Sequence, residues 1–373
     1  MKKILRRCTA ALLAAGTIWV VAATAESSSA AAAVSAMRDS FHLQRLLVQM
    51  ELGGAARKEG MNLSTLLCLG QSPLLWAAYG ALPEKETEPA PQPEPPEPEP
   101  QPAGPTDGDA AAGLTFADNG APSQTVIPSS GKNYTVAGNV YIKNSSDYSL
   151  DPAALDGTFP AELGSADAPQ VLILHTHGSE AYTMPAGEEY TPSGSYRTAD
   201  TEKNMIRVGD EMAAVLSQYG ISVLHDRQIH DTDYNSAYDE SYSSAAAYLE
   251  QYPSISFVLD VHRDAISDAD GQQYKVVSQE DPRAAQVSIV MGSSYDTWMD
   301  NLRLAAAVQE HLLEQHPTLM RPIILRYYGY NQSLSTGSML VEIGAAGNSL
   351  DEAIYAARLF AAGFAETVGG VKS

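Results

Sequence analysis

The sequence predicts an α/β fold: a three-layer sandwich around a mostly parallel central sheet, preceded by a signal or membrane segment and a disordered linker. Two observations predict the sheet. From about residue 170, apolar runs of strand length alternate with amphipathic runs of helix length, a pattern typical of layered α/β proteins. The strand runs are apolar almost throughout, as expected for strands covered on both faces. We therefore place the α/β core at about 168–370.

The individual elements follow this alternation along the chain. Strands are predicted at 140–143, 171–174, 221–224, 255–261, 287–291, 322–325 and 339–343. Helices are predicted between them at 205–219, 242–251, 298–315 and 350–368. Because ligands of α/β sheets gather at the carboxyl ends of the strands, the residues that follow these strands are the first candidates for a functional site.

The chain divides into four parts. Residues 1–25 join a basic start, MKKILRR, to an uncharged apolar run, which indicates a signal peptide or a membrane anchor and places the remainder outside the cytoplasm. Small residues before Glu26 would permit cleavage, so both outcomes stay open. We expect 26–82 to form a helical extracytoplasmic segment. Residues 83–110 are rich in Pro and Glu and predict an extended, disordered linker. The last domain is then 111–373.

The composition excludes several classes of partner and site. Lys and Arg number 23 against 45 Asp and Glu, a net charge of −22, so nucleic acid is not expected as a partner, because phosphate binding needs clustered cations. The two cysteines are Cys8, inside the N-terminal segment, and Cys68. The exported part therefore lacks an intramolecular disulfide and a four-cysteine zinc site. Any metal must be held by histidines and carboxylates.

Reactive side chains follow three of the predicted core strands. HTHGSE places His177 and Glu180 after the first, VHRDA places His262 at the end of the third, and VEIGAAGN places Glu342 at the end of the last. Two imidazoles and one carboxylate hold zinc tetrahedrally and leave a fourth position open, so the sequence predicts a zinc site. Hydrolysis at zinc also needs a carboxylate that moves protons, and Glu342 fits that role by position.

Several of these assignments stay open. Glu202, just before the predicted helix at 205–219, is the rival of Glu180 as third ligand. His175 alternates with His177 along the strand and so faces the other way; it is a hydrogen-bonded core histidine or a ligand. Asp260 is expected to orient a histidine ring rather than to bind metal.

Two further expectations concern charged and polar residues near the core. The alternative to a catalytic Glu342 is a buried ion pair of this residue with Arg263 or Arg326. His225 and His230 lie in or beside predicted loops, and we expect them at the surface.

Six stretches of the sequence carry a resemblance to a known family, and together they cover about 170–370. They are LILHTHGSEAY (172–182), NMIRVGDEMAAVL (204–216), GISVLHD (220–226), VLDVHRDAI (258–266), HPTLMRPIILR (316–326) and YNQSLSTGSMLVEIGAAGNSLDEA (330–353). In these stretches the chain resembles the stage II sporulation protein P family, sporulation cell-wall hydrolases related to zinc-dependent N-acetylmuramoyl-L-alanine amidases.

The resemblance implies a fold of the zinc amidase and carboxypeptidase kind and an activity on peptidoglycan. The implied reaction is zinc-dependent hydrolysis of the N-acetylmuramoyl-L-alanine amide bond during sporulation engulfment, with cleavage of peptide cross-links as an additional activity. The implied partners are a lytic transglycosylase and a membrane protein of the engulfment machinery. The protein would be extracytoplasmic, held at the cell membrane by its N-terminal segment or secreted if that segment is cleaved.

The resemblance also implies roles for individual residues. The metal histidines of the family fall on His177 and His262, and its catalytic glutamate falls on Glu342. A carboxypeptidase-like arrangement makes Glu180 the third ligand, whereas the related cell-wall amidases take a glutamate near the start of the next helix, which is Glu202 here.

On this interpretation Glu342 acts as general base and then as general acid. Arg263, Arg326 and Asn331 would bind the oxyanion or the carboxylates of the peptide. Two other functions stay open: a zinc peptidase that acts only on wall peptides, and a non-catalytic wall-binding scaffold of the same fold. The complete set of two histidines and a glutamate argues against the scaffold.

Overall fold

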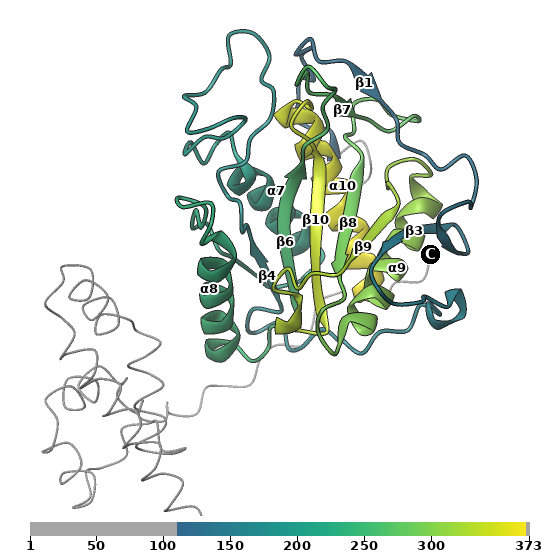
Figure 1. Ribbon diagram of the computed structural model, residues 1–373. Helices are drawn as coiled ribbons and strands as arrows, with labels where there is room; N and C mark the ends of the chain where they lie inside the picture. Colours follow the sequence, from purple (N-terminus) through teal and green to yellow (C-terminus); the bar gives the residue numbers. More distant parts are fainter. Residues whose placement is uncertain (1–109, 371–373) are drawn as a thin grey trace, which may run out of the picture. The chain divides into compact units, whose positions relative to one another are not determined.

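An eight-stranded sheet organises the protein in the computed structural model, which describes residues 110–370. Its strands are β2 (Thr135–Ala137), β3 (Val140–Ser145), β4 (Val171–Leu174), β5 (Val223–His225), β6 (Phe257–Asp264), β8 (Val287–Gly292), β9 (Ile323–Arg326) and β10 (Gly337–Ala345). Across the sheet they run in the order β2-β3-β9-β8-β10-β6-β4-β5. Figure 1 shows β10 between β6 and β8, near the middle of the sheet.

Most strand pairs are parallel, as predicted. Two pairings are antiparallel, β2 with β3 and β8 with β10. Since β8 and β9 run against β10 and β6, the start of β9 lies at the same edge of the sheet as the carboxyl ends of β4, β6 and β10. That edge receives His177, Glu180, His262 and Glu342.

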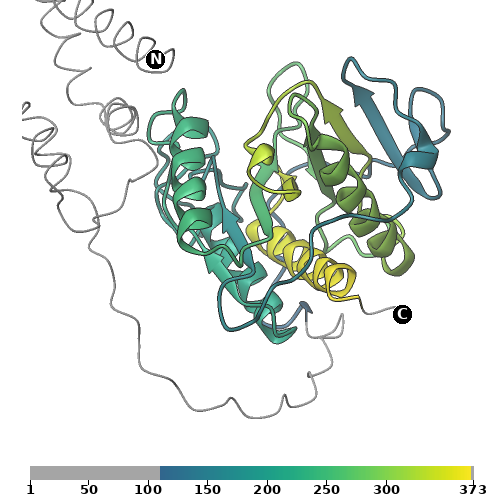
Figure 2. The same cartoon turned by 90° about the horizontal axis from the view of Figure 1, so that it is seen from below.

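Within residues 110–370, four helices cover the two faces of the sheet: α7 (Met205–Gln218), α8 (Ala237–Gln251), α9 (Trp298–Gln315) and α10 (Leu350–Val368). The apolar side chains of α7, α9 and α10 share one core with alternate strand residues such as Val341 and Ile343. A second, smaller core joins α8 to Leu172, Leu174 and Val258 on the opposite face. Figure 2 shows α8 on one side of the sheet and α10, in yellow, on the other. The three-layer α/β prediction is confirmed.

The helix boundaries show where sequence periodicity is informative. The predictions for α9 and α10 match the observed bounds, because large apolar side chains recur at helical spacing there. Helix α8 begins five residues before the predicted start at 242. Its first turn has no apolar stripe, since the buried positions are occupied by small residues, Ala237 and Ser241.

The end of β10 turns sharply into α10. A bulge interrupts the pairing between Glu342 and Ala345, and Gly344 in this bulge has a φ of 65°, which favours glycine. Ser349 then caps α10, accepting a hydrogen bond from the Glu352 backbone N–H in a capping box. The turn therefore has a fixed geometry, and it fixes the end of the strand that carries Glu342.

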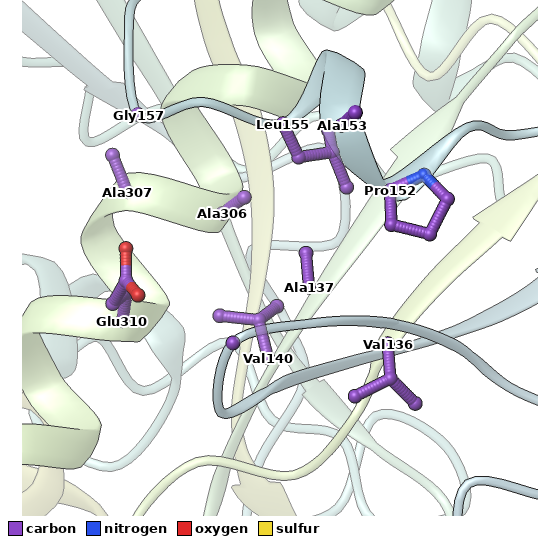
Figure 3. Close-up of a pocket in the computed structure, with 11 residues that line it drawn as sticks. Val136, Ala137, Val140, Pro152, Ala153, Leu155, Gly157, Ala306, Ala307 and Glu310 are labelled. Carbon is purple, nitrogen blue, oxygen red and sulfur yellow. The ribbon is translucent and has the colours of Figure 1, made fainter.

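Two more features lie beside the main sheet. A short parallel pair joins β1 (Ser123–Gln124) to β7 (Lys275–Val276). A cavity of about 310 Å³ lies between the β2–β3 hairpin, α9 and the 3₁₀ turn Pro152–Ala154, with the Glu310 carboxylate among its lining residues (Figure 3). Three strands separate β3 from β6, so this cavity is not where the reactive residues gather.

The N-terminal expectations lie outside the described residues. These are the signal or membrane segment at 1–25, the helical segment at 26–82 and nearly all of the linker at 83–110. Within 110–370, no helix combines the length and apolar composition that crossing a membrane requires.

Candidate metal centre

Three side chains from two neighbouring strand ends form a group suited to a metal ion. His177 and Glu180 lie in the turn after β4, and His262 lies near the end of β6. One potential ligand atom from each residue lies within 4.8 Å of the others. Glu202, the rival third ligand, is exposed in the loop before α7 and is not part of the group. The structure therefore favours Glu180 over Glu202.

The carboxylate of Glu180 lies between the two imidazoles. Its Oε1 is 3.7 Å from His177 Nδ1, and its Oε2 is 3.6 Å from His262 Nδ1. A hydrogen bond of 3.1 Å from the Glu180 N–H to the His177 carbonyl closes the turn that places both residues on one side. Two imidazole nitrogens and a carboxylate are the donor set that zinc accepts at catalytic sites, so the residues present fit that ion.

His262 is oriented by an aspartate on its own strand. His262 Nε2 lies 2.8 Å from Asp260 Oδ1, which leaves Nδ1 directed at the Glu180 carboxylate. Asp260 in turn accepts hydrogen bonds from the backbone N–H and the hydroxyl of Thr176, at 2.9 and 2.7 Å. This is the carboxylate–histidine arrangement that fixes the ring of a metal ligand, and it agrees with the orienting role expected for Asp260.

The two carboxylates also set the charge of His262. Burial alone would lower the pKa of His262, but the attraction of Asp260 and Glu180 outweighs it and raises that pKa well above its usual value. Burial, and the neighbouring His262, lower the pKa of His177. The two carboxylates therefore favour a positive charge at this position. A bound metal ion would supply that charge in place of the proton on His262.

Two arginines hold Glu180. Arg197 donates to Glu180 Oε1 at 3.2 Å, and Arg263 Nη1 lies 3.7 Å from the same oxygen. Burial would raise the pKa of Glu180, but Arg263 and His262 lower it to about 2. The Arg263 guanidinium is buried and also donates to the backbone carbonyls of Ala181 and Tyr196, at 3.1 and 2.9 Å. Arg263 therefore lies at the site, and its observed contacts position Glu180 and the adjoining loop.

Glu342 lies beside the metal group on the next strand. It is paired in register with His262 across β10 and β6. Its Oε2 is buried and has no hydrogen-bond partner, and Glu342 forms no ion pair with Arg263 or Arg326 in the described part of the chain. Burial, followed by the nearby carboxylate of Asp264, raises the pKa of Glu342 to about 8. An unpartnered carboxylate of this kind is suited to proton transfer.

The two remaining predicted residues, at the end of β9 and in the loop after it, are not members of the metal group. Arg326 is exposed at the end of β9, in register with Gly292, and so lies at the sheet edge opposite the carboxyl end of β10. Asn331 donates from Nδ2 to the Tyr238 carbonyl and the Ser241 hydroxyl, at 3.1 and 2.9 Å. The Asn331 side chain thus ties a loop to α8.

The other histidines are more buried than the sequence suggested. His175 is fully buried, with Nδ1 2.8 Å from the Val261 carbonyl and Nε2 2.9 Å from His225 Nε2, so it is a hydrogen-bonded core histidine. The expectation that His225 and His230 lie at the surface is wrong. His230 is buried against Asp226 at 2.9 Å, because the loop after β5 folds back over the turn that carries Gly178.

Sequence reasoning missed three residues around the metal group. Arg197 bridges Glu180 and Asp231, and its guanidinium lies 5.1 Å from the centre of the Tyr234 ring. The Tyr234 ring is stacked on the His177 imidazole, with centroids 4.8 Å apart. Arg197, Asp231 and Tyr234 lie in loops without periodicity, and their spacing from the ligands carries no local signal. A three-dimensional structure was needed to find them.

The comparisons with known proteins agree with the sequence resemblance. The family model of Stage II sporulation protein P matches residues 123–365. The Stage II sporulation protein P of Bacillus subtilis (strain 168) is 24% identical over 223 residues, which are 56% of this chain and 53% of that protein. The chain thus matches about half the length of this curated relative.

Solved structures similar to the chain are those of amidases, among them N-acetylmuramoyl-L-alanine amidases. They include one from Clostridium difficile 630 (17% identity, TM-score 0.35, covering 54% of this chain and 96% of that one). The CwlD amidase of Clostridioides difficile, in complex with the GerS lipoprotein, is 12% identical, with a TM-score of 0.36 and coverage of 54% and 100%. AmiC2 of Nostoc punctiforme is 14% identical, with a TM-score of 0.31 and coverage of 54% and 93%. Since the family model matches well over half of the sequence, this chain belongs to the Stage II sporulation protein P family.

Proposed function

We propose that this protein is a zinc-dependent N-acetylmuramoyl-L-alanine amidase that acts on peptidoglycan during sporulation. The observation that carries the proposal is the juxtaposition of a His₂Glu group with a half-buried glutamate whose Oε2 is buried and unpartnered in the described residues. His177, Glu180 and His262 supply the donors, and Glu342 supplies a carboxylate with a free oxygen one strand away. The family model places the chain in its family, and the resemblance of that family to cell-wall hydrolases implies the substrate class, peptidoglycan.

Each residue of the site has its own role in the proposed reaction. Zinc, when bound, supplies a Lewis acid that polarises the substrate carbonyl. Glu342 accepts the proton of the attacking water at Oε2 and returns it to the nitrogen of the leaving L-alanine. In the metal-free chain the pKa of Glu342 is raised to about 8, and a bound cation would lower it towards neutral pH, where a carboxylate can both accept and return a proton. Asp260 keeps the His262 ring in place throughout.

Substrate contacts are part of the same proposal. Arg263, at the site, is proposed to assist at the oxyanion or at a peptide carboxylate, and Arg326 and Asn331 are proposed to bind more distant parts of the substrate. Cleavage of peptide cross-links is proposed as an additional activity. The cellular setting is engulfment outside the cytoplasm at the cell membrane, together with a lytic transglycosylase and a membrane protein.

The test is product analysis with controlled metal content. The full chain is stripped with a chelator, reloaded with zinc or left metal-free, and incubated with purified peptidoglycan, and the products are identified by mass spectrometry. An amidase releases stem peptides that begin with L-alanine and leaves bare glycan, but only with metal. Shortened stems still attached to glycan would identify the peptidase instead, and binding without any product would identify the scaffold.

A further inference from the structure

A row of aromatic rings leads away from the metal group. The Tyr238 ring lies against the ligand His177, with centroids 5.7 Å apart and planes at 79°. Tyr330 follows Tyr238 at 6.2 Å, and Tyr328 follows Tyr330 at 5.7 Å. We call Tyr238, Tyr330 and Tyr328 the aromatic strip. It is continuous with the catalytic residues, although its members come from α8 and from the loop after β9.

The loop that carries the outer part of the strip has a fixed shape. The Tyr328 carbonyl accepts hydrogen bonds from the backbone N–H groups of Ser293 and Ser294, at 3.0 and 3.2 Å. The approach is so close that a Cβ on Gly292 would lie 2.2 Å from the Tyr328 carbonyl oxygen. The amide of Asn331 ties the other side of the loop to α8.

The backbone of this loop also carries strain. Tyr330 and Asn331 are consecutive non-glycine residues with φ values of 48° and 57°. Such conformations cost free energy and persist where the surrounding structure enforces them, often at ligand-binding positions. The loop therefore holds the Tyr330 ring in place against Tyr238 instead of leaving it to relax.

The outer end of the strip is open to solvent. Tyr328 is 63% exposed, and its neighbour Tyr327 is 53% exposed. Large aromatic side chains held in water by a rigid, strained loop indicate a binding surface. The loop sequence RYYGYN, residues 326–331, contains one cation and no acidic residue, in a chain whose net charge is −22. The surface it offers is aromatic and nearly uncharged.

The chemistry of this surface fits a sugar chain. A pyranose ring presents C–H groups on its faces and hydroxyls at its edges, and a tyrosine presents an apolar ring face and a hydrogen-bonding hydroxyl. We propose that the aromatic strip is a subsite for the neutral glycan strand of the substrate, which would run from the metal group over Tyr238 and Tyr330 to Tyr328. This inference rests on the proposed amidase function, in which the cleaved bond joins a sugar to the stem peptide.

The experiment compares substrates that differ in sugar length. Tyr328→Ala and Tyr328→Trp variants of the full, zinc-loaded chain are assayed on long glycan strands with stem peptides and on a muramyl dipeptide that carries one sugar. Tyr242→Ala is the matched control, because Tyr242 is 45% exposed on α8 and outside the strip. Melting temperatures confirm folding of each variant.

Loss of one stacking ring should raise KM for the long strands by about three- to tenfold. The Trp variant should keep the wild-type KM, and all variants should cleave the one-sugar substrate equally. An unchanged KM on long strands in Tyr328→Ala, or an equal loss on both substrates, would overturn the subsite.

A binding measurement separates this inference from the proposed function. Wild type and Tyr328→Ala are titrated with a bare, uncharged glycan, a β-1,4-linked oligomer of N-acetylglucosamine, and, separately, with free stem peptide. We expect binding of the bare glycan, weakened three- to tenfold in the variant, even if the wild-type protein cleaves nothing. Binding of the free peptide that depends on Tyr328 would mean that the strip binds stems, and would overturn the glycan assignment.

Discussion

Glu342 and His262 lie side by side on neighbouring parallel strands, in register across β10 and β6. Their surroundings differ sharply. The Nε2 of His262 is held by Asp260 at 2.8 Å, whereas the Oε2 of Glu342 has no hydrogen-bond partner in the described residues. The ring of His262 is thus held in one orientation, whereas the Glu342 carboxylate keeps a free oxygen, and this difference suits the proposed roles of metal binding and proton transfer.

The first prediction concerns catalysis by Glu342. Glu342→Gln keeps the size of the side chain but cannot accept a proton, so the rate of peptide release should fall by about 10²–10⁴, with zinc content unchanged. Turnover and metal content are measured on the same purified protein. A variant that keeps zinc and cleaves at the wild-type rate would remove Glu342 from the mechanism, and a variant without zinc would make it a ligand.

The same substitution should stabilise the metal-free protein at high pH. The pKa of Glu342 is raised from 4.5 to about 8 in the folded chain. Between these values the folded state keeps a proton that the unfolded state has lost, so the free energy of unfolding falls as pH rises from about 4.5 to 8. Glutamine does not titrate, so the free energy of unfolding of Glu342→Gln lacks this fall with rising pH.

Urea unfolding of the chelated protein at pH 5 and pH 8 measures this effect. From pH 5 to pH 8, the free energy of unfolding of Glu342→Gln should rise relative to that of the wild type by about 3 kcal/mol. Partial solvent access makes this less than the full effect of the pKa shift. Glu202→Gln, at an exposed glutamate, is the matched control and should follow the wild-type curve. Parallel curves for all three proteins would mean that Glu342 is not neutral in the folded state.

The next prediction concerns the identity of the third metal ligand, and it compares substitutions of Glu180 and Glu202. Glu180→Gln removes a negative charge between two imidazoles and should weaken zinc binding by more than about 100-fold, because losing a ligand costs more than losing a residue that orients one. Glu202→Gln should bind zinc like the wild type, since Glu202 lies outside the group. Competition titration with a zinc chelator measures both. The reverse ranking would move the ligand to Glu202.

Much of the fold was predictable because it is local. Strand β4, a run of four buried apolar residues, and helices α9 and α10 were predicted with their observed bounds. The meeting of three strand ends followed from the parallel arrangement alone. The start of α8 was missed because its buried positions carry small residues, which leave no apolar pattern to read.

The details of the site depend on contacts that are distant in sequence. The sequence placed His177 and Glu180 after the same predicted strand, but the grouping of Glu180, and not Glu202, with the histidines depends on the position of His262, about 80 residues further on. The Arg197 bridge and the aromatic strip combine loops that have no periodic pattern. Likewise, the burial of His230 depends on a loop that folds over a neighbouring turn, and no local pattern encodes that fold.

The last prediction concerns the residue that orients His262. Asp260→Asn keeps the shape of the side chain and can still accept a hydrogen bond from His262 Nε2, but it removes the negative charge that makes the imidazole a stronger donor to metal. Zinc affinity should fall by about 10–100-fold, less than in Glu180→Gln, while full activity should return at saturating zinc. Asp270→Asn, at an exposed aspartate, is the matched control. Zinc titration followed by peptide release, with the melting temperature as a check on folding, gives both quantities. If Asp260→Asn binds zinc as tightly as the wild type, the contact between Asp260 and His262 serves the fold alone, and the metal group would then depend only on Glu180 and the two imidazoles.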